Sequence, residues 1–364
     1  MAAVLLAGCT ELPPVEYTTP RLELATGFDA PVCEGTLDSL DAHLERVEQT
    51  LGLGLGSEPI RMYWLSESET EDVCGGGNGG CFFPATRVVF GQGSSLTHEL
   101  VHAALDTRGE SSFLEEGMAE MLSGVGAYYD PRTAEASIAE HISVSRSEYR
   151  DGGVDYAAAG HFVRWVFEQG GTPALVSLAE ELDRDASMGE ISKALQETMS
   201  DSMDGISERY RNDAPTYYRG LDQSGVKRLW WKALAEGVEI ELDCDDVETR
   251  GPLRDDEPGQ YRVFWVKMPT DGLATVHVSG APDAFVELID PRARLRRGLV
   301  QDWTQPDPRF DPGAHEVEVG PSQPLAVRKG EYLVVVGTRS IGPAVITLGL
   351  TPPPTRSARV PKRN

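Results

Sequence analysis

The sequence has no long apolar run and little positive charge, and each shortage excludes a class of protein. No stretch approaches the roughly 18 apolar residues of a transmembrane helix, so none is predicted. The chain has 33 lysines and arginines against 58 aspartates and glutamates, which gives a formal net charge of −25. So much negative charge disfavours binding to nucleic acid or to anionic membrane surfaces, and we expect no nucleic-acid partner.

Cysteine is also scarce, with five in the chain and no C-x-x-C pair, which disfavours a cysteine-rich zinc site. If Cys9 is set aside, the remaining even number suggests disulfides in an exported protein. Cys74 and Cys81 bracket a glycine-rich run that could close easily, so they are disulfide candidates. Cys33 and Cys244 would then form the remaining pair.

The N-terminus resembles that of a bacterial lipoprotein. Leu6-Ala7-Gly8-Cys9 is similar to a lipobox, which implies lipidation at Cys9 and makes residues 1–9 a truncated signal without a basic start. Residues 10–31 carry spaced prolines and read as a linker between anchor and domain. The expected location is the cell envelope, facing the periplasm or the cell surface, with membrane contact through the lipid anchor only.

The sequence His98-Glu99-Leu100-Val101-His102 has the form H-E-x-x-H. Helical residues four apart lie on one face, so both imidazoles could bind one metal ion, with Glu99 placed as general base on a water. Zinc suits imidazole and carboxylate ligands. Leu105 and Arg108 stand where the metzincin pattern has Gly and His, so the third ligand must come from another element.

Three glutamates in the next segment could supply that third ligand. Ser112-x-x-Glu115 has the form of a capping box, which would occupy Glu115 at a helix start. Glu116 lies one step further round, and Glu120 lies one turn beyond it on the same face. We therefore predict Glu116 as the ligand, and Glu120 as the acceptor for the free ring N–H of a ligating histidine.

The two segments together resemble the gluzincin metallopeptidases of the peptidase MA-like superfamily, which includes thermolysin. Many bacterial members carry aromatic-Leu-x-Glu-Gly-x-Ala-Glu after the H-E-x-x-H helix, and Phe113 to Glu120 matches it. The resemblance implies that Glu116 binds zinc. The gap from His102 is shorter than in thermolysin, which leaves Glu115 as an alternative. The family also implies that the strand at 87–90 borders the cleft and pairs with substrate backbone.

A helix rich in aromatic residues is predicted at 156–170. Similar family members place such a helix behind the active site, so Tyr156 or His161 could stabilise the oxyanion of a reacting peptide. One tyrosine and one histidine on a packed helix are more often core residues, and this alternative stays open.

The predicted fold class is α+β, with a mostly helical zincin-like domain at 32–235 that contains a small sheet. From about Gly237 apolar residues alternate in short runs, which predicts an antiparallel β-sandwich at 236–351 and a disordered tail at 352–364. Arg328 to Val336 resembles part of the bacterial pre-peptidase C-terminal domain. The predicted helices cover 36–50, 134–148, 173–183 and 188–202, and the predicted strands cover 60–65, 87–90, 238–242, 261–266, 274–278, 285–289, 315–319, 332–336 and 344–350.

The sequence thus predicts a lipid-anchored zinc peptidase, a monomer acting on peptide or protein with zinc as its cofactor. The alternative is a surface lipoprotein that keeps the zincin fold without turnover and holds a peptide or a cell-wall polymer. A purely structural zinc site is disfavoured, because Glu99 would have no function as a general base in it. The acidic run 243–246 could bind calcium, although such runs are usually solvated loops.

Overall fold

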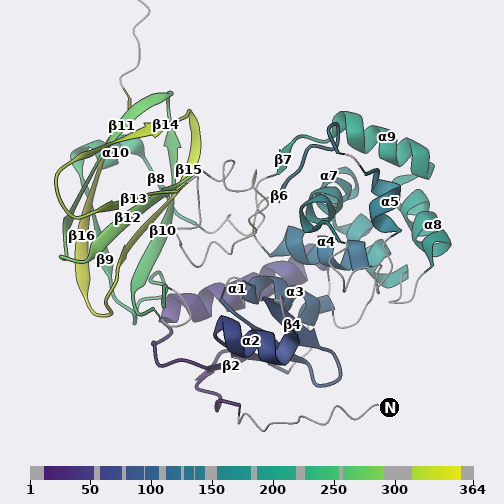
Figure 1. The fold of residues 1–364 in the computed structure, drawn as a ribbon, viewed down its shortest axis with the longest axis horizontal. Helices are drawn as coiled ribbons and strands as arrows, with labels where there is room; N and C mark the ends of the chain where they lie inside the picture. The colour runs from purple at the N-terminus through teal and green to yellow at the C-terminus, as the bar shows by residue number, and fades with distance from the viewer. Residues whose placement is uncertain are drawn as a thin grey trace, which may run out of the picture.

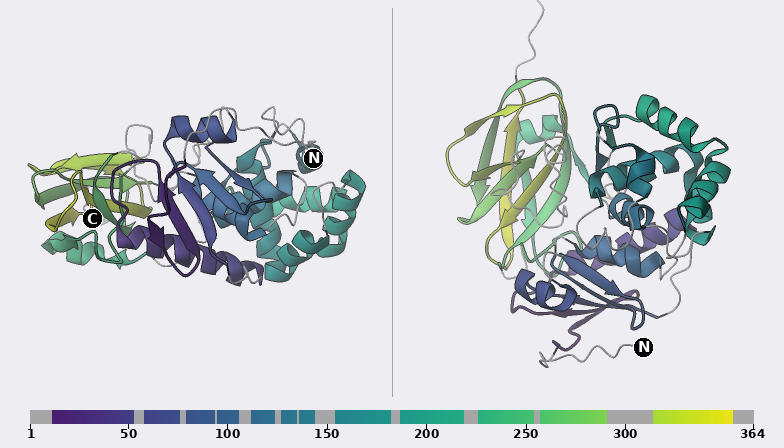
Figure 2. Two further views of the ribbon diagram at one scale, coloured as in Figure 1. Left: turned by 90° about the horizontal axis from the view of Figure 1, so that it is seen from below. Right: turned by 45° about the vertical axis from the view of Figure 1, so that its right-hand side comes forward.

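The computed structural model describes two regions that lie side by side, an α+β region and a β-sandwich (Figures 1 and 2). Among the residues that it describes, no helix has the length and apolar content to cross a membrane. The described residues are 12–52, 58–75, 79–93, 95–105, 112–123, 127–134, 136–143, 154–181, 187–218, 226–253, 257–290 and 314–353. Cys9 lies outside them, as does the tail beyond 353.

The α+β region contains a five-stranded sheet of order β1-β2-β3-β5-β4. The strands are β1 (Tyr17–Thr18), β2 (Leu22–Thr26), β3 (Ile60–Trp64), β4 (Gly80–Phe83) and β5 (Val88–Gly91). The three central strands are parallel, and the edge strands β1 and β4 are antiparallel to their neighbours. The linker predicted through residue 31 is therefore wrong for β1 and β2, because Leu22 and Leu24 are buried core residues. The prediction that β5 borders the cleft needs correction as well, since β4 covers its outer edge.

Helices pack around this sheet and form a second, mostly helical layer (Figure 1). They are α1 (Glu34–Leu51), α2 (Glu67–Cys74), α3 (Leu96–Leu105), α4 (Ser112–Leu122), α5 (Ile138–Ile142), α7 (Tyr156–Glu181), α8 (Met188–Met199) and α9 (Met203–Asp213). Helix α10 (Trp231–Glu236) belongs to the sandwich, where Leu234 packs into the core. The helix predicted over 134–148 is described only at α5. The break predicted before Pro173 is present as Gly171, whose φ of 63° interrupts α7. Two short strands, β6 (Ala127–Tyr128) and β7 (Tyr217–Tyr218), form an antiparallel pair beside α7 in the helical layer.

The sandwich has two sheets, of order β13-β12-β15-β10-β8 and β14-β11-β16-β9. Their strands are β8 (Arg228–Leu229), β9 (Val238–Leu242), β10 (Gln260–Met268), β11 (Gly272–Gly280), β12 (Ala284–Ile289), β13 (Ala314–Glu318), β14 (Gln323–Val327), β15 (Gly330–Thr338) and β16 (Ala344–Thr351). Every strand predicted for the sandwich is present. Strand β11 alternates buried with exposed residues, whereas β12 is buried at all six positions. The boundary at 236 is too late, since β8 already pairs with β10. The α+β class is correct.

Helix α1 connects the two regions (Figure 1). At its start, Cys33 forms a disulfide with Cys244 of the sandwich. The Thr36 hydroxyl donates to the Gly251 carbonyl at 2.8 Å and accepts from the Gly251 N–H at 3.0 Å. Gly35 is required here, because a Cβ would lie 2.5 Å from the Thr249 carbonyl oxygen. A covalent bond and buried hydrogen bonds thus fix the sandwich to α1.

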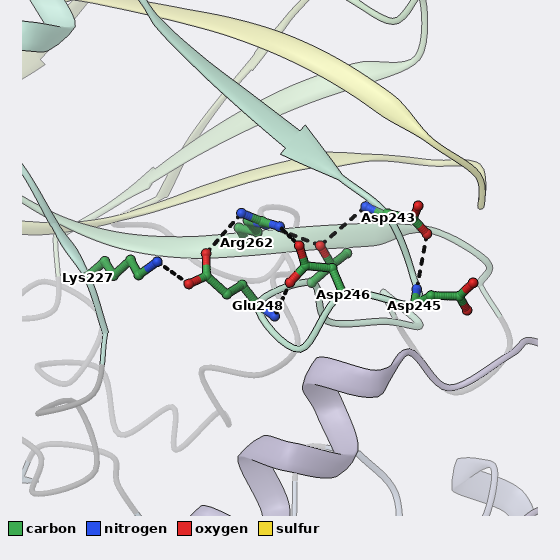
Figure 3. A network of polar contacts seen from close by, with 7 residues as sticks. Lys227, Asp243, Asp245, Asp246, Glu248 and Arg262 are labelled. Carbon is green, nitrogen blue, oxygen red and sulfur yellow. Dashed lines mark hydrogen bonds and ion pairs between the residues drawn. The ribbon is translucent and has the colours of Figure 1, made fainter.

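The acidic run 243–246 lies beside this junction and is paired with basic side chains (Figure 3). Arg262 donates to Asp246 at 2.7 Å and to Glu248 at 3.0 Å, and Lys227 pairs with Glu248 as well. The Asp243 carboxylate accepts from the backbone N–H of Asp245 at 3.1 Å. Within the run, Asp246 is thus ion-paired with Arg262 and Asp243 caps a turn, so the calcium alternative receives no support.

Candidate metal centre

Helix α3 lies between two cores and presents its histidines to α4. Leu100 packs under the sheet, and Val101 packs into the helical layer, both fully buried. His98 and His102 belong to neither core cluster and lie against the carboxylates of α4. A hydrogen bond from α1 holds the first turn of α3 in place. The Nε2–H of His43, a buried residue of α1, donates to the Thr97 carbonyl at 3.0 Å. The apolar pattern of α3 therefore sets where the two imidazoles point.

Three ligand atoms from α3 and α4 converge on one point. His98 Nε2 lies 3.1 Å from His102 Nε2 and 3.0 Å from Glu116 Oε2. His102 Nε2 lies 3.4 Å from the same oxygen. Ligands held at 2.0–2.1 Å around a tetrahedral zinc ion are about 3.3 Å apart, so these separations suit such an ion. His98, His102 and Glu116 could therefore hold a metal ion together.

The outer nitrogens of both imidazoles face further carboxylates. His98 Nδ1 lies 3.2 Å from Glu120 Oε1, and His102 Nδ1 lies 3.5 Å from Glu115 Oε1. A carboxylate at Nδ1 favours the proton there, which leaves the Nε2 lone pair free. Two nitrogen lone pairs and one carboxylate oxygen would then meet with no hydrogen between them. A cation relieves that repulsion, so the residues present fit a bound metal.

Without a cation the same carboxylates favour protonated imidazoles. Burial alone would lower the pKa of His98, but hydrogen bonds to Glu116 and Glu120 outweigh it and raise that pKa to about 10. The pKa of His102 is raised in the same way, chiefly by the charge of Glu116. The pKa of Glu116 is lowered, because both histidines outweigh the effect of its burial. A metal would therefore displace protons when it binds, and its affinity would fall with falling pH.

Glu99 lies beside the ligands and is itself buried. Burial raises the pKa of its carboxyl, and the nearby histidines oppose the shift only in part. Strand β4 passes directly over this side chain, since a Cβ on Gly80 would lie 2.6 Å from Glu99 Cγ and 2.9 Å from its Oε1. The Cys74–Cys81 disulfide is present and joins this strand to α2. A buried carboxylate with a raised pKa is suited to accept a proton.

The two candidates on α7 lie in different environments. The Tyr156 ring lies 6.2 Å from the His98 ring, centroid to centroid, at the edge of the ligand set. His161 is fully buried and lies outside that set. Its Nε2–H donates to the Pro215 carbonyl at 2.7 Å, and its Nδ1 accepts from the Tyr210 hydroxyl at 2.8 Å. Assigning His161 to the oxyanion is therefore wrong, because both ring nitrogens are engaged in the core.

Sequence reasoning missed the role of Glu115, because the capping-box pattern assigned its side chain to the helix start. The carboxylate faces His102. The side chain of Ser112, the other residue of that pattern, lies outside the described part of the structure. It also missed Gly80, which belongs to a glycine-rich run without a chemical pattern of its own. The apolar neighbours Phe162, Val163 and Trp165 were the available signal that His161 belongs to the core.

No protein-family model matches the sequence, and no curated protein matches it. Among solved structures, the chain matches a crystal structure of the pre-peptidase C-terminal domain of collagenase from Bacillus anthracis. The match has 11% identity and a TM-score of 0.23, and it covers 35% of this chain and 94% of that chain. A likeness at this TM-score carries no argument about fold or function, so the gluzincin and pre-peptidase resemblances stay predictions.

Proposed function

We propose that this protein is a zinc-dependent peptidase whose ligands are His98, His102 and Glu116. The observation that carries the proposal is the convergence of three ligand atoms on one point with a buried carboxylate, Glu99, beside them. Imidazole and carboxylate ligands that leave one position open suit a catalytic zinc ion. A structural site would have no use for a further carboxylate with a raised pKa.

Zinc, when bound in such a site, supplies Lewis acidity toward water and a carbonyl oxygen. Glu99 takes a proton from the attacking water while the water oxygen bonds to the peptide carbonyl carbon. The same carboxyl then gives that proton to the leaving nitrogen as the C–N bond breaks. The Tyr156 hydroxyl is the nearby candidate to donate a hydrogen bond to the oxyanion. Glu115 and Glu120 orient the two imidazoles.

The substrate is proposed to be an extended peptide or unfolded protein. Strand β4 is the sheet edge nearest Glu99, and its outer side is free of other described strands. An extended peptide could pair there by β-addition and pass over the ligand set. The proposal thus moves the predicted substrate contact from β5 to β4.

The two disulfides bear on the compartment in which the protein folds. Two disulfides suit a protein that folds in an oxidising compartment. The disulfides therefore support the export of the chain. Lipid attachment at Cys9 and action as a monomer are further parts of the proposal. The β-sandwich is tied covalently to α1, so it is a fixed accessory of the peptidase region.

The experiment measures bound metal and cleavage on the same samples. Purified full-length protein is loaded with zinc, its metal content is determined, and hydrolysis of an unfolded protein and a mixed peptide library is followed. Glu99→Gln has the same shape and cannot take the proton. We expect it to keep one zinc per chain and lose about 100- to 10,000-fold in rate.

His98→Ala is the matched control, because it removes a ligand and is expected to lose zinc and cleavage together. Cleavage that persists in Glu99→Gln would remove the proposed mechanism. Stoichiometric zinc without cleavage of any substrate would favour the alternative, a binding protein with a peptidase-like site.

A further inference from the structure

Helices α4 and α7 contact each other through glycines. A Cβ on Gly117 of α4 would lie 2.5 Å from Val163 Cγ2 and 2.7 Å from the Ala159 carbonyl oxygen. A Cβ on Gly160 of α7 would lie 2.6 Å from Glu120 Cβ. Each of these distances is shorter than real Cβ contacts allow. The two helices can therefore approach this closely only if both positions lack a side chain.

The contact at Gly160 lies directly behind the metal centre. Glu120, which Gly160 touches, holds its carboxylate 3.2 Å from His98 Nδ1. The contact between Gly160 and Glu120 thus sets how far the Glu120 carboxylate reaches toward His98. Gly160 belongs to neither of the two sequence motifs, and its effect on the site is visible only in three dimensions.

We infer that Gly160 is a positioning residue of the metal centre, acting through Glu120. The inference rests on the proposed metal site. A methyl group at residue 160 would meet Glu120 Cβ first, because the next atoms, Glu120 Cγ at 3.6 Å and Met121 N at 3.7 Å, are at ordinary contact distances. Glu120 Cβ is attached to the helix backbone and cannot swing away. The backbone of α4 at Glu120 must therefore shift, which moves the Glu120 carboxylate relative to His98.

The expected effect is on metal affinity. Removing the carboxylate partner of a ligating histidine typically costs about 10- to 100-fold in metal affinity. A displaced carboxylate keeps part of its interaction, so Gly160→Ala should cost about tenfold, at the lower end of that range. The free energy of unfolding of the metal-free protein should change less than the free energy of zinc binding. Alanine is a better helix former than glycine, and this offsets part of the strain at residue 160.

The test is a competition titration of zinc against a chelator with the metal-free, full-length protein. Gly189→Ala in α8 is the matched control, since it makes the same change in a helix where the nearest atom would be Ser187 Oγ at 3.8 Å. We expect wild type and Gly189→Ala to bind zinc equally and Gly160→Ala to bind about tenfold more weakly. Equal affinity of Gly160→Ala and wild type would overturn the inference. Failure of wild type to bind zinc would instead remove the metal site and the inference with it.

A double-mutant cycle separates positioning from a general loss of structure. Glu120→Ala removes the carboxylate while it keeps the Cβ that Gly160 contacts. If Gly160 acts through that carboxylate, adding Gly160→Ala to Glu120→Ala should change zinc affinity by less than about twofold, because the two effects are coupled. A further tenfold loss in the double variant would show that Gly160 acts by another route and would contradict the inference.

Discussion

The carboxylate of Glu115 lies 3.5 Å from Nδ1 of His102, on the side of the imidazole away from the ligand point. Likewise, the carboxylate of Glu120 lies 3.2 Å from Nδ1 of His98. Helix α4 therefore supplies one carboxylate that converges with both Nε2 atoms and two that orient the rings from behind. Because Glu115 and Glu116 are adjacent in the chain, the roles of orienting residue and ligand are separated by a single step along the helix.

The first prediction distinguishes these two roles. Glu116→Ala removes a ligand and should abolish stoichiometric zinc binding, whereas Glu115→Ala should weaken it by about 10- to 100-fold. Glu115→Gln, which keeps an oxygen acceptor for the His102 N–H, should weaken it less. Zinc affinities measured by competition with a chelator test this order. If Glu115→Ala lost the metal and Glu116→Ala kept it, the two assignments would have to be exchanged.

The second prediction concerns Gly80 and the proposed base. A methyl group at Gly80 would press on the side chains of Glu99 and Ser95, since its Cβ would lie 2.6 Å from Glu99 Cγ and 2.7 Å from Ser95 Oγ. We expect Gly80→Ala to lower kcat by up to about 100-fold, because a catalytic group displaced by an ångström can cost that much in rate. Zinc content should stay at the wild-type level, because the three atoms nearest to the added methyl group belong to Glu99 and Ser95 and not to a proposed ligand. Gly189→Ala again serves as the control, and a loss of zinc in Gly80→Ala would contradict this separation of roles.

The third prediction concerns His161 and the pH dependence of stability. Burial lowers the pKa of His161 to about 4, against 6.5 as its ordinary value. Because the folded pKa is the lower one, the unfolded chain takes up this proton first as the pH falls. The stabilisation is complete above pH 6.5 and is lost between pH 6.5 and about 4, by about 3 kcal/mol.

Urea unfolding at pH 7 and pH 4.5 measures this loss. His161→Gln cannot titrate, so its free energy of unfolding should fall less than that of wild type over this interval. Comparing the two proteins cancels the contributions of the other titrating groups, which are the same in both. An identical fall in the two proteins would show that His161 is not the source of the pH dependence.

Helical spacing was sufficient to predict that His98 and His102 share one face, because residues one turn apart do so whatever the rest of the fold is. Glu116 was predicted from its place after the expected capping box and from the gluzincin resemblance, and the structure brings it to both histidines. The sandwich strands follow from period-two alternation for a similar reason. These predictions use only interactions within one element.

The corrections all depend on contacts between distant elements. The proline-rich region appeared to be a linker, but Leu22 and Leu24 find a partner strand in β3, well beyond α1 in the chain. His161 could have faced either the site or the core, and only the position of Tyr210 and Pro215 decides it. Glu115 and Gly80 likewise gain their surroundings from α3 and β4. A single sequence cannot place such partners, because their spacing is set by packing.

The most direct test is a crystal structure of the zinc-loaded protein with anomalous data recorded at the zinc absorption edge. We predict one anomalous peak within about 2.0–2.2 Å of His98 Nε2, His102 Nε2 and a Glu116 carboxylate oxygen. Glu99 should lie next to the ion without binding it. A peak at another position, or an ion held by Glu99, would contradict the account.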